Sequence, residues 1–334
     1  MAESDARQHP AIQVLESLIN IDSTSEREHE IGLFLEQHLQ GLGYTAERIS
    51  IAPGSSRHNV YAYLGEQRKA RVLLTSHMDT VPPHIPFSID PEDSDVIRGR
   101  GACDDLGPLV AQVYAVEELR AEGKLKDGDV SFLFVVGEEK GGPGMLAAND
   151  MGLTWEAGIF GEPTEGKLGK GHKGNLVFEL VAQGKACALN DLSAVRWPES
   201  DLLGPSTLNI GKIEGGVGYN VLAASATALC SIRIATGLPG IKRTVSDIVA
   251  KHPDVELKFN FEYPETLLEW KFEGLEAAPM AYGTDVPRLR GEHRKVLYGP
   301  GSILVAHGKD ESIRISEIME SIKVNKRLTM ELLK

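Results

Sequence analysis

Residues 71–80 read RVLLTSHMDT and join a short apolar run to a histidine and an aspartate. The run at 71–76 is apolar and rich in β-prone residues, which predicts a buried strand. His77 follows this strand directly, and ligand sites in α/β folds lie beyond the carboxyl ends of strands. Asp79 suits the carboxylate that orients a metal-bound imidazole. The alternative for His77 is a purely structural role beside the strand.

The neighbouring segments alternate between strand and helix patterns. Residues 130–136 (VSFLFVV) and 157–161 predict further buried strands. Residues 25–28 (SERE) match a capping box and predict the start of a helix there. A second helix is indicated by apolar residues at helical spacing, namely Leu109, Val113, Val116 and Leu119. The alternation predicts an α/β domain with a mainly parallel mixed sheet flanked by helices.

The pattern changes after about residue 170. Strands are predicted at 175–182, 207–213, 226–234 and 255–261, with a helix at 242–251 and a closing helix at 316–333. The simplest organisation is one α/β domain, residues 1–169 and 266–334, with a smaller α+β domain inserted at 170–265.

Composition excludes several classes of protein. The net charge of −13 argues against a surface that binds nucleic acid or an anionic membrane. The three cysteines form no C-x-x-C pair, which argues against a thiolate zinc site. No stretch approaches the roughly 20 apolar residues of a membrane span. The N-terminus as written has no secretory signal. We therefore expect a cytoplasmic protein, with secretion as the alternative if the N-terminus is truncated.

A pair of acidic residues follows the glycines of residues 99–105, GRGACDD. The adjacent carboxylates of Asp104 and Asp105 repel each other unless a cation neutralises them. A solvated turn is the alternative. The segment is not a dinucleotide-binding loop, because the required third glycine is absent.

Further candidate ligands leave predicted strands in the same way. Glu138 and Glu139 follow the strand at 130–136, so one could bind a metal while the other acts as a general base. Glu162 follows another predicted strand, and His307 lies in a glycine-rich segment near the C-terminus. Each signal is weak alone, and their joint occurrence in this order indicates a metal site.

Five segments carry a resemblance to a known family: HMDTVPP, GRGACDDLG, GEEKGGPGM, GEPTEGKLGKGHKG and YGPGSILVAHGKDE. They resemble the signature blocks of the dinuclear zinc exopeptidases and deacylases. That family includes acetylornithine deacetylase, succinyl-diaminopimelate desuccinylase, aminoacylase and glutamate carboxypeptidases. The similarity is greatest to a carboxypeptidase-like branch found in fungi, and it spans roughly residues 11–330.

The resemblance implies two divalent cations, expected to be Zn²⁺ with Co²⁺ as the alternative. Asp104 would bridge both cations. The remaining ligands would be His77 and Glu162 for one cation, and Glu139 and His307 for the other. This donor set of imidazoles and carboxylates also suits catalytic zinc on chemical grounds.

The resemblance also implies catalytic roles. Glu138 matches the general base, and Asp79 matches the carboxylate partner of His77. In this family the peptide that follows the bridging aspartate is cis, so we expect a cis bond between Asp104 and Asp105.

Residues implied to hold the substrate are Asn220, Arg233 and Thr284. The fork of Arg233 could bind a free carboxylate through two hydrogen bonds, although an ordinary surface position on a strand is the alternative. We therefore expect an exopeptidase of carboxypeptidase type that acts on peptides with a free C-terminus. A deacylase of N-acyl amino acids, of the acetylornithine deacetylase type, is the alternative.

The inserted domain departs from the family pattern around residues 188–203. Ala188 stands where relatives carry a histidine thought to stabilise the oxyanion, and the helix expected next is short and interrupted by Pro198. The chain could use another donor, such as His172, or it could bind metal with impaired catalysis. A homodimer is typical of the family, and the shortened helix argues against one here. A binding protein with solvated acidic turns is a further alternative.

Overall fold

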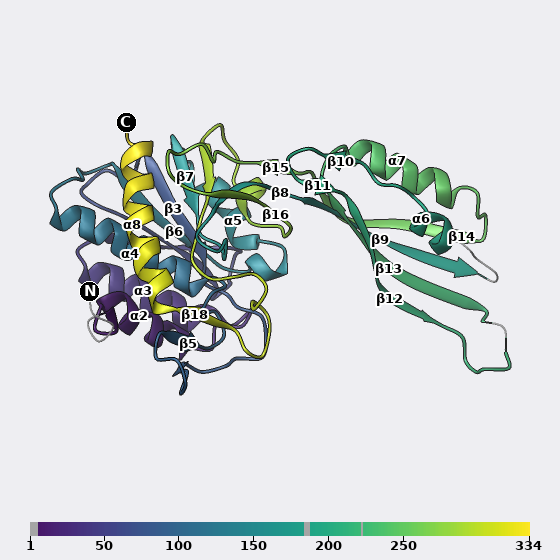
Figure 1. The fold of residues 1–334 in the computed structure, drawn as a ribbon, viewed down its shortest axis with the longest axis horizontal. Helices are drawn as coiled ribbons and strands as arrows, with labels where there is room; N and C mark the ends of the chain where they lie inside the picture. Colours follow the sequence, from purple (N-terminus) through teal and green to yellow (C-terminus); the bar gives the residue numbers. More distant parts are fainter. Residues whose placement is uncertain (1–5, 184–187, 222) are drawn as a thin grey trace. The chain divides into compact units, whose positions relative to one another are not determined.

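The computed structural model describes residues 6–183, 188–221 and 223–334 (Figure 1). These residues form two compact units. Unit 1 comprises Met1–Gly169, Leu268–Ala277 and Thr284–Lys334, and unit 2 comprises Lys170–Leu267 and Ala278–Gly283. The sequence segment at 184–187 (GKAC), which precedes Ala188, lies outside the described residues.

A six-stranded sheet forms the centre of unit 1, in the order β1-β2-β6-β3-β7-β17. Its strands are β1 (Thr45–Ser50), β2 (His58–Tyr63), β3 (Val72–His77), β6 (Val130–Val135), β7 (Ala157–Phe160) and β17 (Arg294–Leu297). Strands β6, β3, β7 and β17 run parallel, whereas β1 and β2 pair antiparallel at one edge. Every residue of β3, β6 and β7 is buried, and most of their residues are apolar, as is typical of parallel strands covered on both faces.

Helices cover this sheet. They are α2 (Pro10–Ile19), α3 (His29–Gly41), α4 (Leu106–Ala121), α5 (Pro143–Ala148) and α8 (Ile315–Leu332). Helix α4 packs against β3, and it lies side by side with α2 and α8 (Figure 1). Helix α3 packs against β1 and β2. Short elements complete the unit: β4 (Ser88–Ile89), β5 (Val96–Arg98), β18 (Ser312–Arg314), η1 (Glu138–Lys140), η2 (Asn149–Met151) and η3 (Val286–Arg288).

The capping box predicted at 25–28 is wrong. Helix α3 has Glu28 at its N-cap, and no side chain caps it. Ser25 donates instead to Asp79 Oδ2 at 3.0 Å. The buried carboxylate of Glu28 accepts two hydrogen bonds from Arg57, at 2.6 and 2.7 Å. A charge-assisted pair of this kind is stronger than a neutral cap, so tertiary partners outweigh the local motif.

Unit 2 is built on a four-stranded antiparallel sheet in the order β12-β13-β9-β14. The strands are β9 (Gly174–Gln183), β12 (Thr207–Gly215), β13 (Ser225–Ile234) and β14 (Val255–Tyr263). Helices α6 (Ala188–Ser193) and α7 (Leu238–Val249) share a hydrophobic core with alternate residues of β9 and β13. The remaining short strands are β8 (Leu168–His172), β10 (Glu199–Ser200), β11 (Gly204–Pro205), β15 (Thr266–Leu267) and β16 (Ala277–Met280).

The architecture confirms the predicted α/β fold with a mainly parallel mixed sheet flanked by helices. Within the described ranges, we find no helix with both the length and the apolar content that crossing a bilayer requires.

Candidate metal and catalytic site

The carboxyl ends of three adjacent parallel strands carry the candidate ligands. His77 is the last residue of β3, and Glu138 begins η1 just after β6. Glu162 follows β7, the other neighbour of β3. Because parallel strands end at the same edge of a sheet, side chains far apart in sequence converge there.

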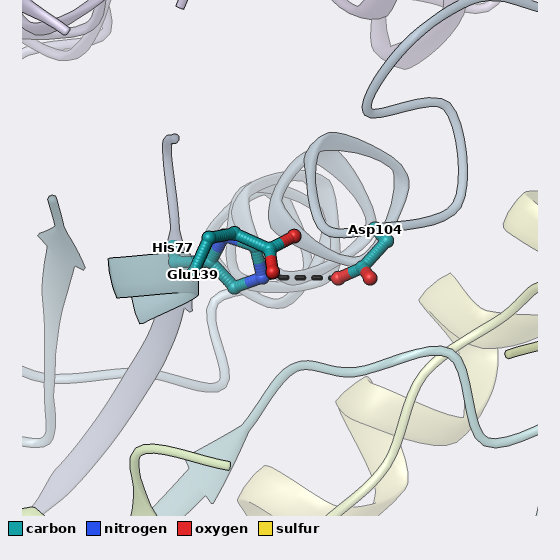
Figure 2. Close-up of side chains that lie close together, drawn as sticks. All are labelled: His77, Asp104 and Glu139. Carbon is teal, nitrogen blue, oxygen red and sulfur yellow. Dashed lines mark hydrogen bonds and ion pairs between the residues drawn. The ribbon is translucent and has the colours of Figure 1, made fainter. Parts of the chain in front are cut away.

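Three side chains form what we call the ligand cluster: His77, Asp104 and Glu139. One ligand atom of each lies within 4.8 Å of the others. Figure 2 shows the three side chains directed toward one another, with Asp104 in the loop that precedes α4. His77 Nε2 lies 3.0 Å from Asp104 Oδ1.

His307 adds a second imidazole beside the ligand cluster. Its Nε2 lies 3.0 Å from Asp104 Oδ2 and 2.8 Å from Glu139 Oε1. The two carboxylate oxygens of Asp104 therefore face two different imidazoles, one on each side.

This arrangement fits divalent cations. Ligand atoms that each lie about 2.0–2.2 Å from one tetrahedral zinc ion are themselves separated by about 3.3–3.6 Å. The nitrogen–oxygen distances of 2.8–3.0 Å are roughly half an ångström shorter, as in hydrogen bonds between these groups, so the side chains would move apart slightly to admit an ion. The imidazole and carboxylate donors suit zinc or cobalt better than the hard cations calcium and magnesium.

Hydrogen bonds fix the orientation of His77. Its Nδ1 lies 2.8 Å from the backbone carbonyl oxygen of Asp79, so Nδ1 donates, and in the neutral ring Nε2 carries the lone pair that can bind a metal. The carboxylate of Asp79 is 3.6 Å from Nδ1, beyond a hydrogen bond. It accepts instead from the backbone N–H groups of Glu138 at 2.9 Å and Glu139 at 3.3 Å. Asp79 thus orients His77 through its main chain and holds the η1 turn through its side chain.

The charges at the ligand cluster are strongly coupled. Burial lowers the pKa of His77, but the carboxylates of Asp104 and Asp79 outweigh burial and raise it well above its usual value. Hydrogen bonds to Asp104 and Glu139 raise the pKa of His307 to about 10. Burial raises the pKa of Asp104, but the two imidazoles lower it below its usual value.

A second group of carboxylates lines a small cavity next to His77, formed by Glu138, Glu162 and Asp285. Burial raises the pKa of Glu138 and of Glu162 well above the usual value, and neighbouring carboxylates add to the effect. Burial also raises the pKa of Asp285 to about 6, although Arg288 opposes the shift. So many buried acids with few positive partners favour bound cations at this site.

The candidate substrate residues occupy different environments. Thr284 in unit 1 is buried, and its Oγ1 accepts a hydrogen bond from the Val286 N–H at 3.2 Å. Asn220 is exposed in the loop between β12 and β13 of unit 2. Arg233 is half-buried on β13 and lies opposite Asn175 of β9.

Ala188 is the first residue of α6, and its side chain is buried in the core of unit 2. Helix α6 has only six residues.

Sequence reasoning missed residues that contact or adjoin the candidate ligands. Arg100 and Glu311 form a buried ion pair, with Nη1 and Oε2 2.6 Å apart, and the pair also hydrogen-bonds to the backbone of Asp104 and His307. The sequence predicted a site role for Thr284, whereas its neighbour Asp285 lines the cavity. In the sequence, Arg100, Glu311 and Asp285 are marked only by their charge and by their closeness to candidate site residues. The peptide between Asp104 and Asp105 is cis, as the resemblance implied.

Comparisons with known proteins bear on this site. Residues 73–331 match the model of peptidase family M20/M25/M40. A Peptidase M20 domain-containing protein of Schizosaccharomyces pombe is 42% identical, with 96% of this chain and 84% of that protein covered. That alignment runs over 342 positions, more than the 334 residues of this chain, so the relative has residues at positions that this chain lacks. A probable carboxypeptidase of Aspergillus clavatus is 36% identical, with 94% of this chain and 86% of that protein covered.

Solved structures share the fold. A tripeptidase from Staphylococcus aureus superposes with a TM-score of 0.80 at 20% identity, covering 96% of this chain and 98% of the other. A dinuclear metal-binding peptidase of the M20 family from Bacillus subtilis gives 0.72 at 16% identity, covering 100% and 99%. The expected family is confirmed: this chain belongs to peptidase family M20/M25/M40.

Proposed function

We propose that this chain is a two-metal exopeptidase of carboxypeptidase type, which cleaves the amide bond next to a free C-terminal carboxylate. Its family supports a hydrolase that acts on peptides. The observation that carries the proposal is the division of the Asp104 oxygens between His77 and His307. A carboxylate placed in this way can serve two cations at once, which is what a two-metal site requires.

The proposed ligands are those that the family resemblance implies. His77, Asp104, Glu139 and His307 lie together, and Glu162 lines the cavity next to His77. Asp104, His77 and Glu162 would hold one cation, and Asp104, Glu139 and His307 would hold the other. Zn²⁺ is the expected ion, and Co²⁺ is the alternative. When bound, a pair of such cations polarises the amide carbonyl and makes a water molecule acidic enough to be a nucleophile at neutral pH.

Glu138 is the proposed general base. Its side chain lines the cavity beside His77, and its backbone N–H is held by the carboxylate of Asp79 at 2.9 Å. A carboxylate oxygen of Glu138 would take the proton of the attacking water and deliver it to the nitrogen of the leaving amine. This role needs the ionised form. Positive charge favours that form, and Arg288 Nη1 already lies 3.8 Å from Glu138 Oε1.

The proposed substrate is a small peptide, and Arg233 of unit 2 is the proposed partner of its free carboxylate. The guanidinium can bind a carboxylate through two parallel hydrogen bonds. We further propose residues 1–169 and 266–334 as the catalytic domain and 170–265 as an inserted lid or dimerisation domain, shortened around 188–203, that supplies Asn220 and Arg233 to the substrate. N-acyl amino acids present the same carboxylate, so a deacylase remains the alternative.

One observation favours reduced activity. Ala188 has no hydrogen-bond donor in its side chain and is buried in the core of unit 2. Loss of one oxyanion donor costs roughly 10²–10³ in turnover. The second candidate is therefore a relative that binds metal but turns over slowly. Recovery of activity in Ala188→His would identify the missing donor as the cause.

The decisive experiment measures hydrolysis by the zinc-loaded protein, with and without chelator. The panel holds blocked dipeptides, tripeptides with a free C-terminus, the same peptides with an amidated C-terminus, and N-acetyl-ornithine. We expect chelator-sensitive cleavage that requires the free carboxylate. Glu138→Gln should bind zinc normally and hydrolyse the substrate roughly 10²–10⁴-fold more slowly. The control is Glu156→Gln, because Glu156 is an exposed partner of Arg71.

The outcomes separate the candidates. Cleavage of N-acetyl-ornithine in preference to peptides would replace the carboxypeptidase with the deacylase. A folded, zinc-loaded protein that cleaves no substrate would support the second candidate, a relative that binds metal but has impaired catalysis. Full activity in Glu138→Gln would contradict the assigned base, and activity that survives complete zinc removal would contradict the metal mechanism.

A further inference from the structure

We propose that Arg100 and Glu311 form a positioning pair that holds the loops of Asp104 and His307 at the spacing a shared cation needs. The inference rests on the proposed two-metal function and assigns a role to two residues outside the proposed ligand set. It concerns only unit 1, in which all four residues lie.

The pair is deeply buried. The side chain of Arg100 is 2% exposed and that of Glu311 is 1% exposed, with Arg100 Nη1 and Glu311 Oε2 2.6 Å apart. Removing two charges from water is costly, and a buried ion pair is weak support for the stability of a fold. The contacts that the pair makes with its surroundings are therefore the better guide to its role.

Glu311 holds the loop of Asp104. Its Oε1 accepts hydrogen bonds from the backbone N–H groups of Cys103 and Asp104, both at 3.3 Å. Its Oε2 is occupied by Arg100. With both oxygens engaged, Glu311 acts on the backbone of the bridging residue and not as a ligand itself.

Arg100 holds the loop of His307. Its Nη2 donates to the backbone carbonyl oxygen of His307 at 3.5 Å, and its Nε donates to that of Pro83 at 3.2 Å. His307 has a φ of +64°, a left-handed conformation that is unfavourable for residues other than glycine. Such conformations persist where the surroundings fix them. Arg100 is one of the groups that fix this backbone.

The two sets of contacts meet across the proposed site. The same ion pair touches the backbone of Asp104 and that of His307, whose side chains are 3.0 Å apart at Asp104 Oδ2 and His307 Nε2. Partners that orient metal ligands typically contribute roughly 10–100-fold to metal affinity. Loss of this pair should therefore weaken zinc binding on the side of His307.

Two variants test the pair. Arg100→Lys keeps the charge near Glu311 but lacks the fork that reaches two loops at once. The double variant Arg100→Met with Glu311→Leu removes both charges, so that neither is left buried without a partner. The control is Arg120→Lys. Arg120 also binds a carboxylate, that of Glu117 at 2.6 Å, and a backbone carbonyl, that of Leu42 at 3.0 Å.

The measurement is the dissociation constant of each zinc equivalent, obtained by competition with a chelating dye, together with the Tm of the metal-free proteins. We expect both variants to bind at least the equivalent held by His307 roughly 10–100-fold more weakly than wild type, with the control unchanged. Wild-type affinity in either folded variant, or an equal loss in Arg120→Lys, would overturn the positioning role. A wild-type protein that binds no zinc would instead overturn the proposed function.

Discussion

At the scale of single residues, protons on the candidate ligands would compete with a bound cation. His307 has a pKa raised to about 10 by Asp104 and Glu139, so its imidazole is protonated at pH 7 in the metal-free protein. Because a metal needs the neutral ring, zinc binding at pH 7 should release a proton from His307, in addition to any released by His77, whose pKa is also raised. The affinity should rise with pH up to about pH 10, by up to about tenfold per unit for one proton.

Calorimetry in buffers of different ionisation enthalpy measures that release directly. Uptake of a proton, or none exchanged, would contradict the assignment of His307 as a ligand. The ion pairs of His307 with Asp104 and Glu139 also stabilise the metal-free fold. This stabilisation is complete below the ordinary histidine pKa of about 6.5 and is lost as pH rises through about 10.

Asp285 gives a second prediction at this scale. Burial raises its pKa to about 6, so its contribution to stability is full below 3.8 and is lost as pH rises through about 6. Among the described residues, its Oδ2 has no hydrogen-bond partner. The metal-free Asp285→Asn protein should therefore be more stable than wild type at pH 8, by on the order of 2 kcal/mol, and similar to it at pH 4.

Urea denaturation at the two pH values tests this prediction. The matched control is Asp150→Asn on η2. The difference in free energy of unfolding between this control and wild type should be the same at both pH values. A wild-type protein that is the more stable of the two at pH 8 would show that Asp285 and Arg288 stabilise each other by more than the burial of Asp285 costs.

At the scale of elements, close contacts between backbone segments fix the positions of the strands that precede the candidate ligands. A β-carbon at Gly299, just after β17, would collide with the backbone carbonyl oxygen of Glu162. Backbone cannot swing away as a side chain can. We expect Gly299→Ala to destabilise the fold by ~1–3 kcal/mol and to weaken zinc binding through Glu162.

Denaturation and zinc titration of this variant can be compared with Gly41→Ala. A β-carbon at Gly41, the last residue of α3, would meet nothing within 4 Å. Equal stability of the two variants, or a normal zinc affinity in Gly299→Ala, would show that the turn after β7 adapts.

Most elements could be predicted because their signals are local. The strands at 71–76, 130–136 and 157–161 are present as β3, β6 and β7, and the closing helix is α8. The start of α3 was mispredicted, because Ser25 and Glu28 bind partners distant in sequence. A local sequence pattern carries no information about partners that are distant in sequence.

At the scale of the whole molecule, the two units have separate hydrophobic cores. Unit 1 is built around β3, β6 and α4, and unit 2 around β9, β13 and α7. All proposed metal ligands lie in unit 1. Zinc should therefore raise the transition temperature of unit 1 and leave that of unit 2 unchanged. Ligand at 100 times its dissociation constant stabilises the state that binds it by about 2.7 kcal/mol.

Scanning calorimetry with and without chelator checks this expectation. Two transitions, of which only one moves with zinc, would support it. A single transition that moves as a whole would show that the units unfold together, and two unmoved transitions would contradict metal binding in unit 1.

The sequence by itself determined the fold class, the family and the order of the candidate ligands. Apolar periodicity reports buried strands and helices, and ligand-type residues directly after strands report a site at the carboxyl edge of a sheet. The roles of His77, Asp104, Glu138, Glu139 and the other site residues stay predictions. The domain boundary at 170–265 stays a prediction as well.

Only the tertiary structure decided which groups pair at the site. It places one oxygen of Asp104 on each imidazole, turns the carboxylate of Asp79 toward η1, and joins Arg100 to Glu311 across 211 residues of chain. The physical reason is that hydrogen bonds and ion pairs depend on distances of about 3 Å between atoms, and the path of the whole chain sets these distances.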